Sequence, residues 1–102
     1  MLKIMIHEIP AEQRWVLAGN LTEPWASELT AKWELARESR AGKKCVVDLM
    51  DVEFIDDSGK KVLSRMVTEG AEFMTDALYT KYVIESLKGR RRNGIGGPND
   101  AP

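Results

Sequence analysis

The sequence predicts an α/β domain in which helices pack on one side of a mixed four-stranded sheet, in the order ββαβαβα. Three observations support this fold class. Apolar and polar residues alternate near the start, which is the period of a half-buried strand. Three later segments carry apolar residues at helical spacing. A β-branched apolar run, Cys45-Val46-Val47, follows the first of them, as a buried parallel strand would.

The composition limits the classes of function. The chain has 102 residues, enough for one domain with a single core. Lys and Arg total 15 against 16 Asp and Glu, so no bulk charge favours nucleic acid. No apolar run approaches the roughly 20 residues of a membrane span, and no secretory signal is visible. Together with a single cysteine, Cys45, expected to be a buried core residue, this favours a cytoplasmic protein without membrane insertion.

Two strands are predicted at the N-terminus. In the first, Leu2, Ile4 and Ile6 alternate with Lys3, Met5 and His7. Residues 10–12 indicate a turn, and residues 15–18 form the second strand, which Gly19 and Asn20 should end. We expect the two strands to pair antiparallel, because the connection between them is short.

The first helix is predicted to begin near Thr22. Thr22 is an acceptable N-cap, Glu23 suits the first turn, and Pro24 lacks an N–H where none is needed. One face then carries large apolar residues at i, i+4, i+8 and i+11, namely Trp25, Leu29, Trp33 and Ala36. We expect this face to pack on the sheet, although two tryptophans one turn apart could also form an interaction surface. Gly42 should end the segment.

The central feature is residues 46–63, in which an acidic segment joins the buried strand to a second helix, predicted over about residues 58–70. We call residues 56–61 the elbow. Asp and Ser are preferred N-cap residues, because their side-chain oxygens accept the free N–H groups of a helix's first turn. The elbow should therefore combine backbone donors with the positive end of a helix dipole. Behind it, the core face of the helix should carry Val62, Leu63, Met66 and Val67.

The C-terminal third is predicted as a short strand, a helix and a tail. Residues 71–74 form the fourth strand, and Asp76 should cap a third helix. One side of that helix should carry Leu78, Tyr79, Tyr82, Val83, Ser86 and Leu87. From Lys88 the composition changes to Gly, Arg and Pro, which cannot bury enough apolar surface to order the chain. We therefore predict a domain over residues 1–87 and a flexible tail over residues 88–102.

Two motifs resemble a known family. Asp48-Leu49, Val52, Phe54-Ile55-Asp56 and Ser58-Gly59 follow a pattern found around a phosphoacceptor serine, and Gly19-Asn20-Leu21-Thr22 resembles a second motif upstream of it. Both are similar to motifs of the STAS family, whose best-known members are bacterial anti-sigma factor antagonists. The likeness covers about residues 2–87 and implies a STAS-like fold. The family's usual last strand and helix have no counterpart, so the chain resembles a short, C-terminally truncated member.

The resemblance implies a non-catalytic regulatory module that binds an anti-sigma factor of the histidine-kinase-like fold and is released by phosphorylation. At the acceptor position this chain has Asp57, which cannot accept phosphate from a Ser/Thr kinase. Asp57 could imitate part of a phosphate, Ser58 could be the acceptor instead, or the module could bind its partner without a switch. We favour the last interpretation. Plain helix capping would also explain both residue types without any function.

The predicted docking surface comprises the elbow, the loop over residues 20–23 and the exposed side of the second helix. Its named site residues are Thr22, Glu23, Asp56, Asp57, Ser58, Gly59, Lys60 and Lys61. The two lysines either shape a partner interface or, as we favour, only offset the two aspartates. Two other functions stay open: a structural STAS subunit of a lipid-transport ATPase complex, and a small-ligand sensor.

An enzyme is not expected. Asp56 and Asp57 are adjacent at a turn, so their carboxylates should point in different directions. His7 is the only histidine, so neither a Ser/His arrangement nor a metal cluster can be assembled. No P-loop or dinucleotide fingerprint is present, and we expect no cofactor. The sequence does not indicate an oligomeric state.

Overall fold

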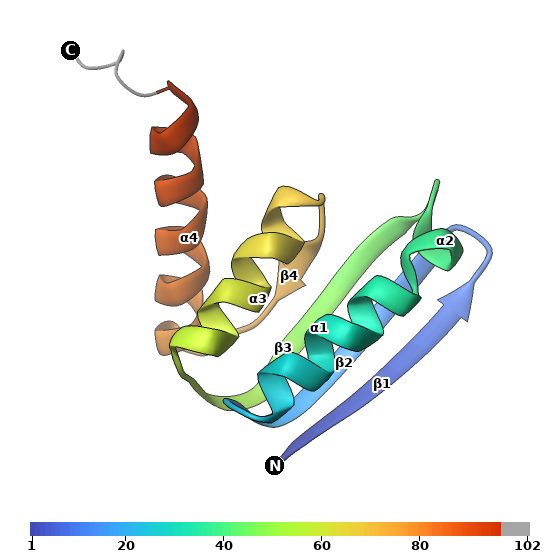
Figure 1. Cartoon of the computed structure of the whole chain (residues 1–102), viewed down its shortest axis with the longest axis horizontal. Helices are drawn as coiled ribbons and strands as arrows, with labels where there is room; N and C mark the ends of the chain where they lie inside the picture. Colours follow the sequence, from blue (N-terminus) through green and yellow to red (C-terminus); the bar gives the residue numbers. More distant parts are fainter. Residues whose placement is uncertain (97–102) are drawn as a thin grey trace.

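The computed structural model describes the backbone of residues 1–96 and the side chains of residues 1–89. One sheet has the strand order β1-β2-β3-β4. Strand β1 (Leu2–Ile9) is antiparallel to β2 (Glu12–Leu21), whereas β3 (Lys44–Ile55) runs parallel to both β2 and β4 (Glu72–Met74). Helices α1 (Trp25–Leu35) and α3 (Asp57–Thr68) lie along one face of the sheet, and α4 (Leu78–Gly96) packs beside α3 (Figure 1). The predicted mixed four-stranded sheet is confirmed.

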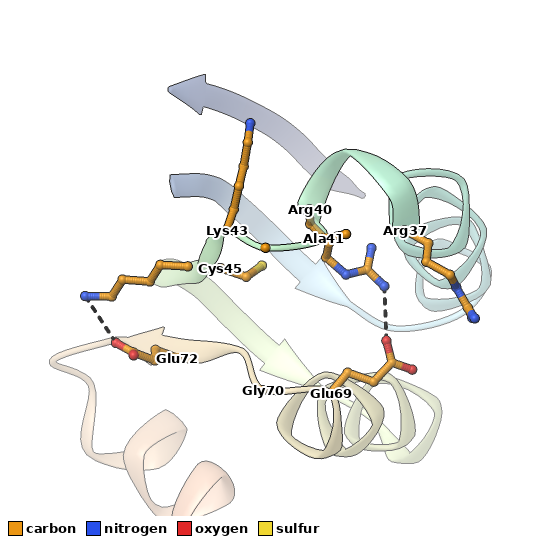
Figure 2. Close-up of a pocket in the computed structure, with 10 residues that line it drawn as sticks. Arg37, Arg40, Ala41, Lys43, Cys45, Glu69, Gly70 and Glu72 are labelled. Carbon is orange, nitrogen blue, oxygen red and sulfur yellow. Dashed lines mark hydrogen bonds and ion pairs between the residues drawn. The ribbon is translucent and has the colours of Figure 1, made fainter. Parts of the chain in front are cut away.

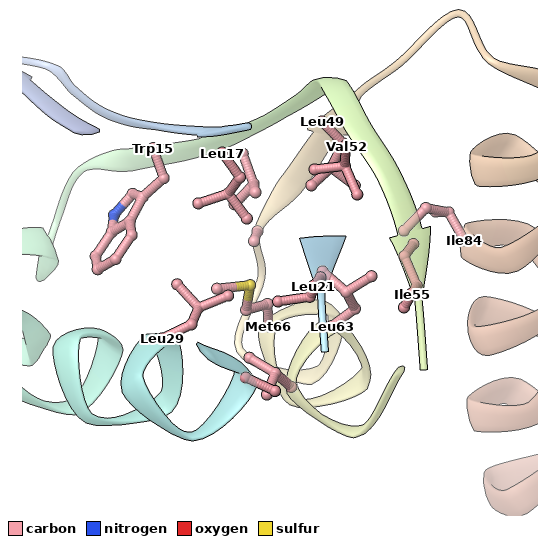
Figure 3. Packing of buried hydrophobic residues seen from close by; sticks show 14 of the residues in the cluster. Trp15, Leu17, Leu21, Leu29, Leu49, Val52, Ile55, Leu63, Met66 and Ile84 are labelled. Atoms are coloured by element: carbon pink, nitrogen blue, oxygen red, sulfur yellow. The ribbon is translucent and has the colours of Figure 1, made fainter. Parts of the chain in front are cut away.

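The core lies between the sheet and helices α1 and α3 (Figure 3). Its largest fully buried apolar members come from strands and helices alike: Trp15, Leu17, Leu21, Leu29, Trp33, Leu49, Ile55, Leu63 and Met66. Burying a side chain of this size contributes about 1.5–3 kcal/mol. The predicted core faces of α1 and α3 are confirmed by this burial, except that Trp25, Ala36 and Val67 are only partly buried.

The second strand is longer than predicted. It continues through Gly19 and Asn20 to Leu21, because two register shifts, between Val16 and Ala18 and between Gly19 and Asn20, absorb the irregularity. Gly19 has φ +114°, and a Cβ there would lie 2.2 Å from the carbonyl oxygen of Met1. The glycine therefore permits a β-bulge and a close backbone approach where we predicted a strand end.

Helix α1 begins later than predicted and is not capped by Thr22. Pro24 occupies the N-cap position, with no side-chain cap, and Trp25 is the first helical residue. The N–H of Glu23 instead donates to the carboxylate of Asp56, which directly follows the C-terminal end of β3. A tertiary contact thus takes the place of the predicted local cap. After α1, a short helix α2 (Arg37–Arg40) was not predicted, and Gly42 follows it with φ +79°, as expected of a turn.

Helix α4 differs from the prediction in its buried face and in its length. The residues that face the core are Thr80, Val83, Ile84 and Leu87, whereas Leu78 and Tyr82 are exposed. The helix also continues past the predicted boundary at residue 87 to Gly96, where we predicted a flexible segment. Extending a helix adds one hydrogen bond per residue without a new nucleation step. The rest of the predicted tail, residues 97–102, lies outside the described residues, and a division between domain and tail stays a prediction.

Candidate functional site

Asp56 holds the elbow together. Its carboxylate accepts hydrogen bonds from two backbone N–H groups: that of Gly59, at 2.8 Å to Oδ1, and that of Glu23, at 3.1 Å to Oδ2. The first bond caps α3, and the second fixes the loop before α1. The backbone N–H of Asp56 also donates to the carbonyl of Leu21, at 3.2 Å. One residue thereby joins the C-terminal ends of β2 and β3 to the first turn of α3.

Gly59 lets α3 begin directly against the end of β2. A Cβ at this position would lie 2.2 Å from the carbonyl oxygen of Leu21 and 2.9 Å from side-chain atoms of Leu21 and Ile55. The residue is buried, and no side chain could be accommodated without moving the backbone. Together with the Asp56 bonds, this close contact makes the elbow rigid.

The residues that follow Asp56 present the outer surface of the elbow. Asp57 is the first residue of α3 and is exposed, as is Lys61, whereas Ser58 and Lys60 are partly buried. Helix capping was predicted for this region, and of the elbow residues Asp56 is the one whose side chain caps α3. Asp57 therefore has no part in the cap. A negative charge at this position is favourable, because it lies at the positive end of the α3 dipole.

A shallow groove of about 410 Å³ adjoins the elbow between α3 and α4. It is lined by Asp57, Lys60, Lys61, Ser64 and Leu87. Two ammonium groups and one carboxylate thus border a groove whose apolar part, Leu87, comes from α4. Ser64 belongs to the exposed side of the second helix, which was predicted as part of the docking surface. Leu87 was not predicted there, because its place beside the groove depends on how α4 packs against α3.

Tyr79 supports the elbow from the other side. Its hydroxyl donates a hydrogen bond to the carbonyl oxygen of Ile55, at 3.1 Å, and so ties the first turn of α4 to the last residue of β3. Phe54, Leu78 and Tyr82 nearby in the chain are large and exposed. This contact could not be predicted from the sequence, since a tyrosine on a helical face shows no preference for a particular carbonyl.

The structure brings the predicted docking residues together. Thr22 and Glu23 lie at the end of β2, next to the elbow, through the Glu23–Asp56 bond and the pairing of Leu21 with Ile55. Glu23 also accepts a hydrogen bond from Ser27, at 2.8 Å, which orders the first turn of α1. All eight predicted positions therefore belong to one corner of the molecule, at the N-terminal ends of α1 and α3.

A larger hollow, of about 640 Å³, lies at the opposite end of α3 (Figure 2). It is lined by four cationic side chains, Arg37, Arg40, Lys43 and Lys44, and by Cys45, Glu69 and Glu72 among others. Each cation already has a carboxylate partner: Glu34 for Arg37, Glu69 for Arg40, Glu8 for Lys43 and Glu72 for Lys44. Internal ion pairs thus satisfy these cations, and the hollow has the character of a structural junction.

Two carboxylates in this region have lowered pKa values. For Glu69, burial acts to raise the pKa, but hydrogen bonds from Trp33, Arg65 and Arg40 outweigh it and bring the pKa below its usual value. The pKa of Glu8 is lowered mainly by hydrogen bonds from Lys43 and Gln13. Burial raises the pKa of the Cys45 thiol, which is typical of an unreactive core cysteine.

Two further observations concern the residues that the structure describes. Among them, no group of three or more His, Cys, Asp or Glu side chains is arranged to hold a metal ion. None of the helices, within the same limits, combines the length and apolar character needed to cross a membrane.

Comparison with known proteins shows the fold. No protein-family model matches the sequence, and no curated protein matches it either. Among solved structures, the chain is similar to the unphosphorylated anti-sigma factor antagonist SpoIIAA, with a TM-score of 0.64 and 16% identity over 93% of this chain and 99% of that one. It is also similar to an uncharacterized DUF3478-family protein with a SpoIIAA-like fold from Shewanella loihica PV-4. That match has a TM-score of 0.53 and 12% identity over 92% of this chain and 78% of the other. The STAS-like fold implied by the two sequence motifs is therefore confirmed.

Proposed function

We propose that this SpoIIAA-like domain is a non-catalytic regulatory module that binds a protein partner through the docking surface, namely the elbow together with Thr22 and Glu23. An anti-sigma factor of the histidine-kinase-like fold is the partner we favour. The similarity to an anti-sigma factor antagonist supports the general class. The motif at Phe54-Ile55-Asp56 and Ser58-Gly59 supports the location.

One observation carries this proposal: the elbow is rigid inside and charged outside. Asp56 and Gly59 are fully engaged in joining β2, β3 and α3. Asp57 and Lys61 point outward from that fixed frame. A preorganised surface loses little conformational entropy when it binds, so its charges can contribute to affinity and to partner selection.

We further propose that this docking needs no serine phosphorylation. The exposed first position of α3 is occupied by Asp57, whose single negative charge does not depend on a kinase. A phosphoserine there would carry up to two negative charges and three acceptor oxygens. Asp57 therefore reproduces only part of a phosphate, and a partner that tolerates one charge at this corner would bind constitutively.

Charge reversal on the elbow tests the docking surface. Lys60→Glu with Lys61→Glu should weaken binding to the anti-sigma factor encoded in the same genome by at least about tenfold, or ~1.4 kcal/mol, in calorimetric titration. The matched control is Lys32→Glu with Lys44→Glu, which makes the same change in net charge at two exposed positions, one on α1 and one at the start of β3, away from the elbow. Equal affinities for both double variants and the wild type would remove the elbow from the interface.

Intact-mass measurement tests the absence of a switch. After incubation with the same factor and ATP, the wild type should gain no phosphate, whereas Asp57→Ser should gain one. Phosphate on the wild type that disappears in Ser58→Ala would show that Ser58 is the acceptor and would contradict the constitutive version. Failure of the genome's anti-sigma factors to bind, together with capture of a transport ATPase by the wild type, would favour a structural subunit of a lipid-transport complex instead.

A further inference from the structure

Strand β1 forms the outer edge of the sheet, with β2 on its inner side. The carbonyl of Met1 accepts a hydrogen bond from the N–H of Asn20, at 2.9 Å, so Met1 directs its backbone oxygen toward β2. Backbone direction alternates along a strand. The N–H and C=O groups that point away from β2 are therefore those of Leu2, Ile4, Ile6 and Glu8.

The same edge carries exposed apolar side chains. Met5 is 42% exposed, Ile6 41% and Ile9 56%, although all three belong to a regular strand of eight residues. A long edge strand with apolar side chains and free backbone groups is a template for another strand. Proteins commonly cover such an edge, and strand addition is a common way to do so.

The sequence of β1 is self-complementary about its centre. Ile4-Met5-Ile6 is the same in both directions around Met5. When two antiparallel copies are related by a two-fold axis perpendicular to the sheet, residues on the same face oppose each other. An axis between the two Met5 residues therefore places Ile4 opposite Ile6 of the partner subunit. Both side chains lie on the helix-covered face of the sheet, and the backbone N–H and C=O groups of both residues point toward the other copy.

We propose that β1 pairs antiparallel with β1 of a second copy of this chain, with Met5 opposite Met5 of the partner subunit, so that one sheet continues across a symmetric homodimer. The four outward-facing residues of each strand would form about eight backbone hydrogen bonds. A typical protein interface has about 10 ± 5 direct hydrogen bonds. The second copy supplies partners for both the outward-pointing backbone groups and the exposed apolar side chains of this edge.

This dimer leaves the docking surface open. Strand β1 is at one edge of the sheet, and α3 begins at the end of β3, two strands away (Figure 1). Both elbows of the dimer are therefore accessible. The homodimer does not depend on the proposed partner, so either proposal can fail without the other.

Mass measurement across a concentration series tests the dimer with the full chain. The wild type should change from the mass of one chain to that of two, and Met5→Lys should weaken dimerisation at least about tenfold, because two ammonium groups would then oppose each other. Met50→Lys is the matched control, since Met50 on β3 is also 42% exposed. A one-chain mass up to the solubility limit would overturn the proposal. Equal weakening by both variants would do the same, since it would place the contact on the open face of the sheet.

A cysteine cross-link tests the register. In the proposed pairing, the two Met5 residues form a non-hydrogen-bonded pair, with Cα atoms about 4.5 Å apart, which is within disulfide range. Met5→Cys should therefore give a covalent dimer with oxidised glutathione. Ile9→Cys, on the same strand but opposite Met1 of the partner subunit, should stay uncross-linked. The native Cys45 is buried and should not interfere. Cross-linking of Ile9→Cys alone would contradict the register.

Discussion

Asp56 and Asp57 are neighbours in the sequence but have different surroundings. The carboxylate of Asp56 binds the N–H groups of Gly59 and Glu23, whereas Asp57 is exposed at the start of α3. The sequence placed Asp57 at the acceptor position and predicted that the two carboxylates point in different directions, but it did not show which of them caps α3. Asp56 therefore helps to maintain the geometry of the elbow, and Asp57 is available to a partner.

Replacing each aspartate separates these two functions. Asp56→Ala should lower the free energy of unfolding by about 1–2 kcal/mol, because the helix cap and the link to the α1 loop are both lost. Asp57→Ala should change it by less than about 0.5 kcal/mol, since an exposed side chain makes few contacts. Urea unfolding measures both. A larger loss for Asp57→Ala than for Asp56→Ala would contradict the assignment of the cap.

Gly59 and Gly89 are both helical glycines, but their surroundings predict opposite effects of substitution. Gly59→Ala should lower the free energy of unfolding by about 1–3 kcal/mol, since the new methyl would meet the backbone of Leu21. Gly89→Ala should raise it by up to about 1 kcal/mol, because no atom lies within 4 Å of the added Cβ and alanine favours helix. The measurement is again urea unfolding. A stabilising Gly59→Ala would show that the elbow is not closely packed.

At the scale of the elements, α1, α2 and α3 are joined by a polar cluster around Glu69. Glu69 accepts hydrogen bonds from Trp33 of α1, at 2.9 Å, and from Arg40 of α2, at 3.0 Å. Arg65 of α3 binds both Glu69 and Glu34. The guanidinium of Arg40 also lies 3.6 Å from the centre of the Trp33 ring. These contacts hold the ends of the three helices in fixed positions relative to one another, far from the elbow.

This cluster predicts a pH-dependent contribution to stability. The pKa of Glu69 is lower in the folded state, so its stabilisation is present above the unfolded value of about 4.3 and is lost as the pH falls through the folded value. The wild type should therefore exceed Glu69→Gln in free energy of unfolding at pH 7, and the difference should shrink below about pH 4.

The control is Glu72→Gln. Glu72 pairs with Lys44 at 3.6 Å, and both side chains are more than half exposed. Such a pair contributes about 0–1 kcal/mol, so Glu72→Gln should stay close to the wild type at pH 7. A difference for Glu69→Gln that grew on acidification would contradict the lowered pKa.

Regular patterns predicted most elements, and tertiary contacts account for most of the errors. Local periodicity predicted strands β1 and β3 and helices α1 and α3, and all four elements are confirmed. Some predicted core positions are nevertheless exposed or only partly buried, namely Ile6, Trp25, Ala36 and Val67. Thr22 is not the α1 cap, because Asp56 reaches the Glu23 N–H from another element. The buried face of α4 is shifted, because Tyr79 binds the Ile55 carbonyl, whereas Val83 and Ile84 face the core. Local sequence does not encode either contact.

The site was predictable in position but not in its internal arrangement. The order of polar residues after β3 located the elbow, and the parallel β2–β3 pair brings Thr22 and Glu23 beside it. The groove lined by Ser64 and Leu87 depends on the packing of α4 against α3, which the sequence does not specify. The polar residues after β3 therefore located the candidate site, and only the structure showed which residues of α3 and α4 adjoin it.

At the scale of the whole molecule, the proposed interfaces occupy separate regions. The docking surface lies at the N-terminal ends of α1 and α3, and the proposed self-pairing edge is β1. At the opposite end of α3, the cations Arg40, Lys43 and Lys44 that line the hollow are already paired with carboxylates of this chain. We therefore expect a partner to bind at the elbow corner and to leave the Glu69 end unchanged.

Amide hydrogen exchange with and without the anti-sigma factor tests this arrangement most directly. Binding should slow exchange in residues 56–61 and in the loop at residues 22–23, because a docked partner excludes water from them. Residues 37–44, at the far end of α3, should exchange at the same rate in both states. Protection of residues 37–44 with an unchanged elbow would contradict the central claim that the corner after β3 is the docking surface.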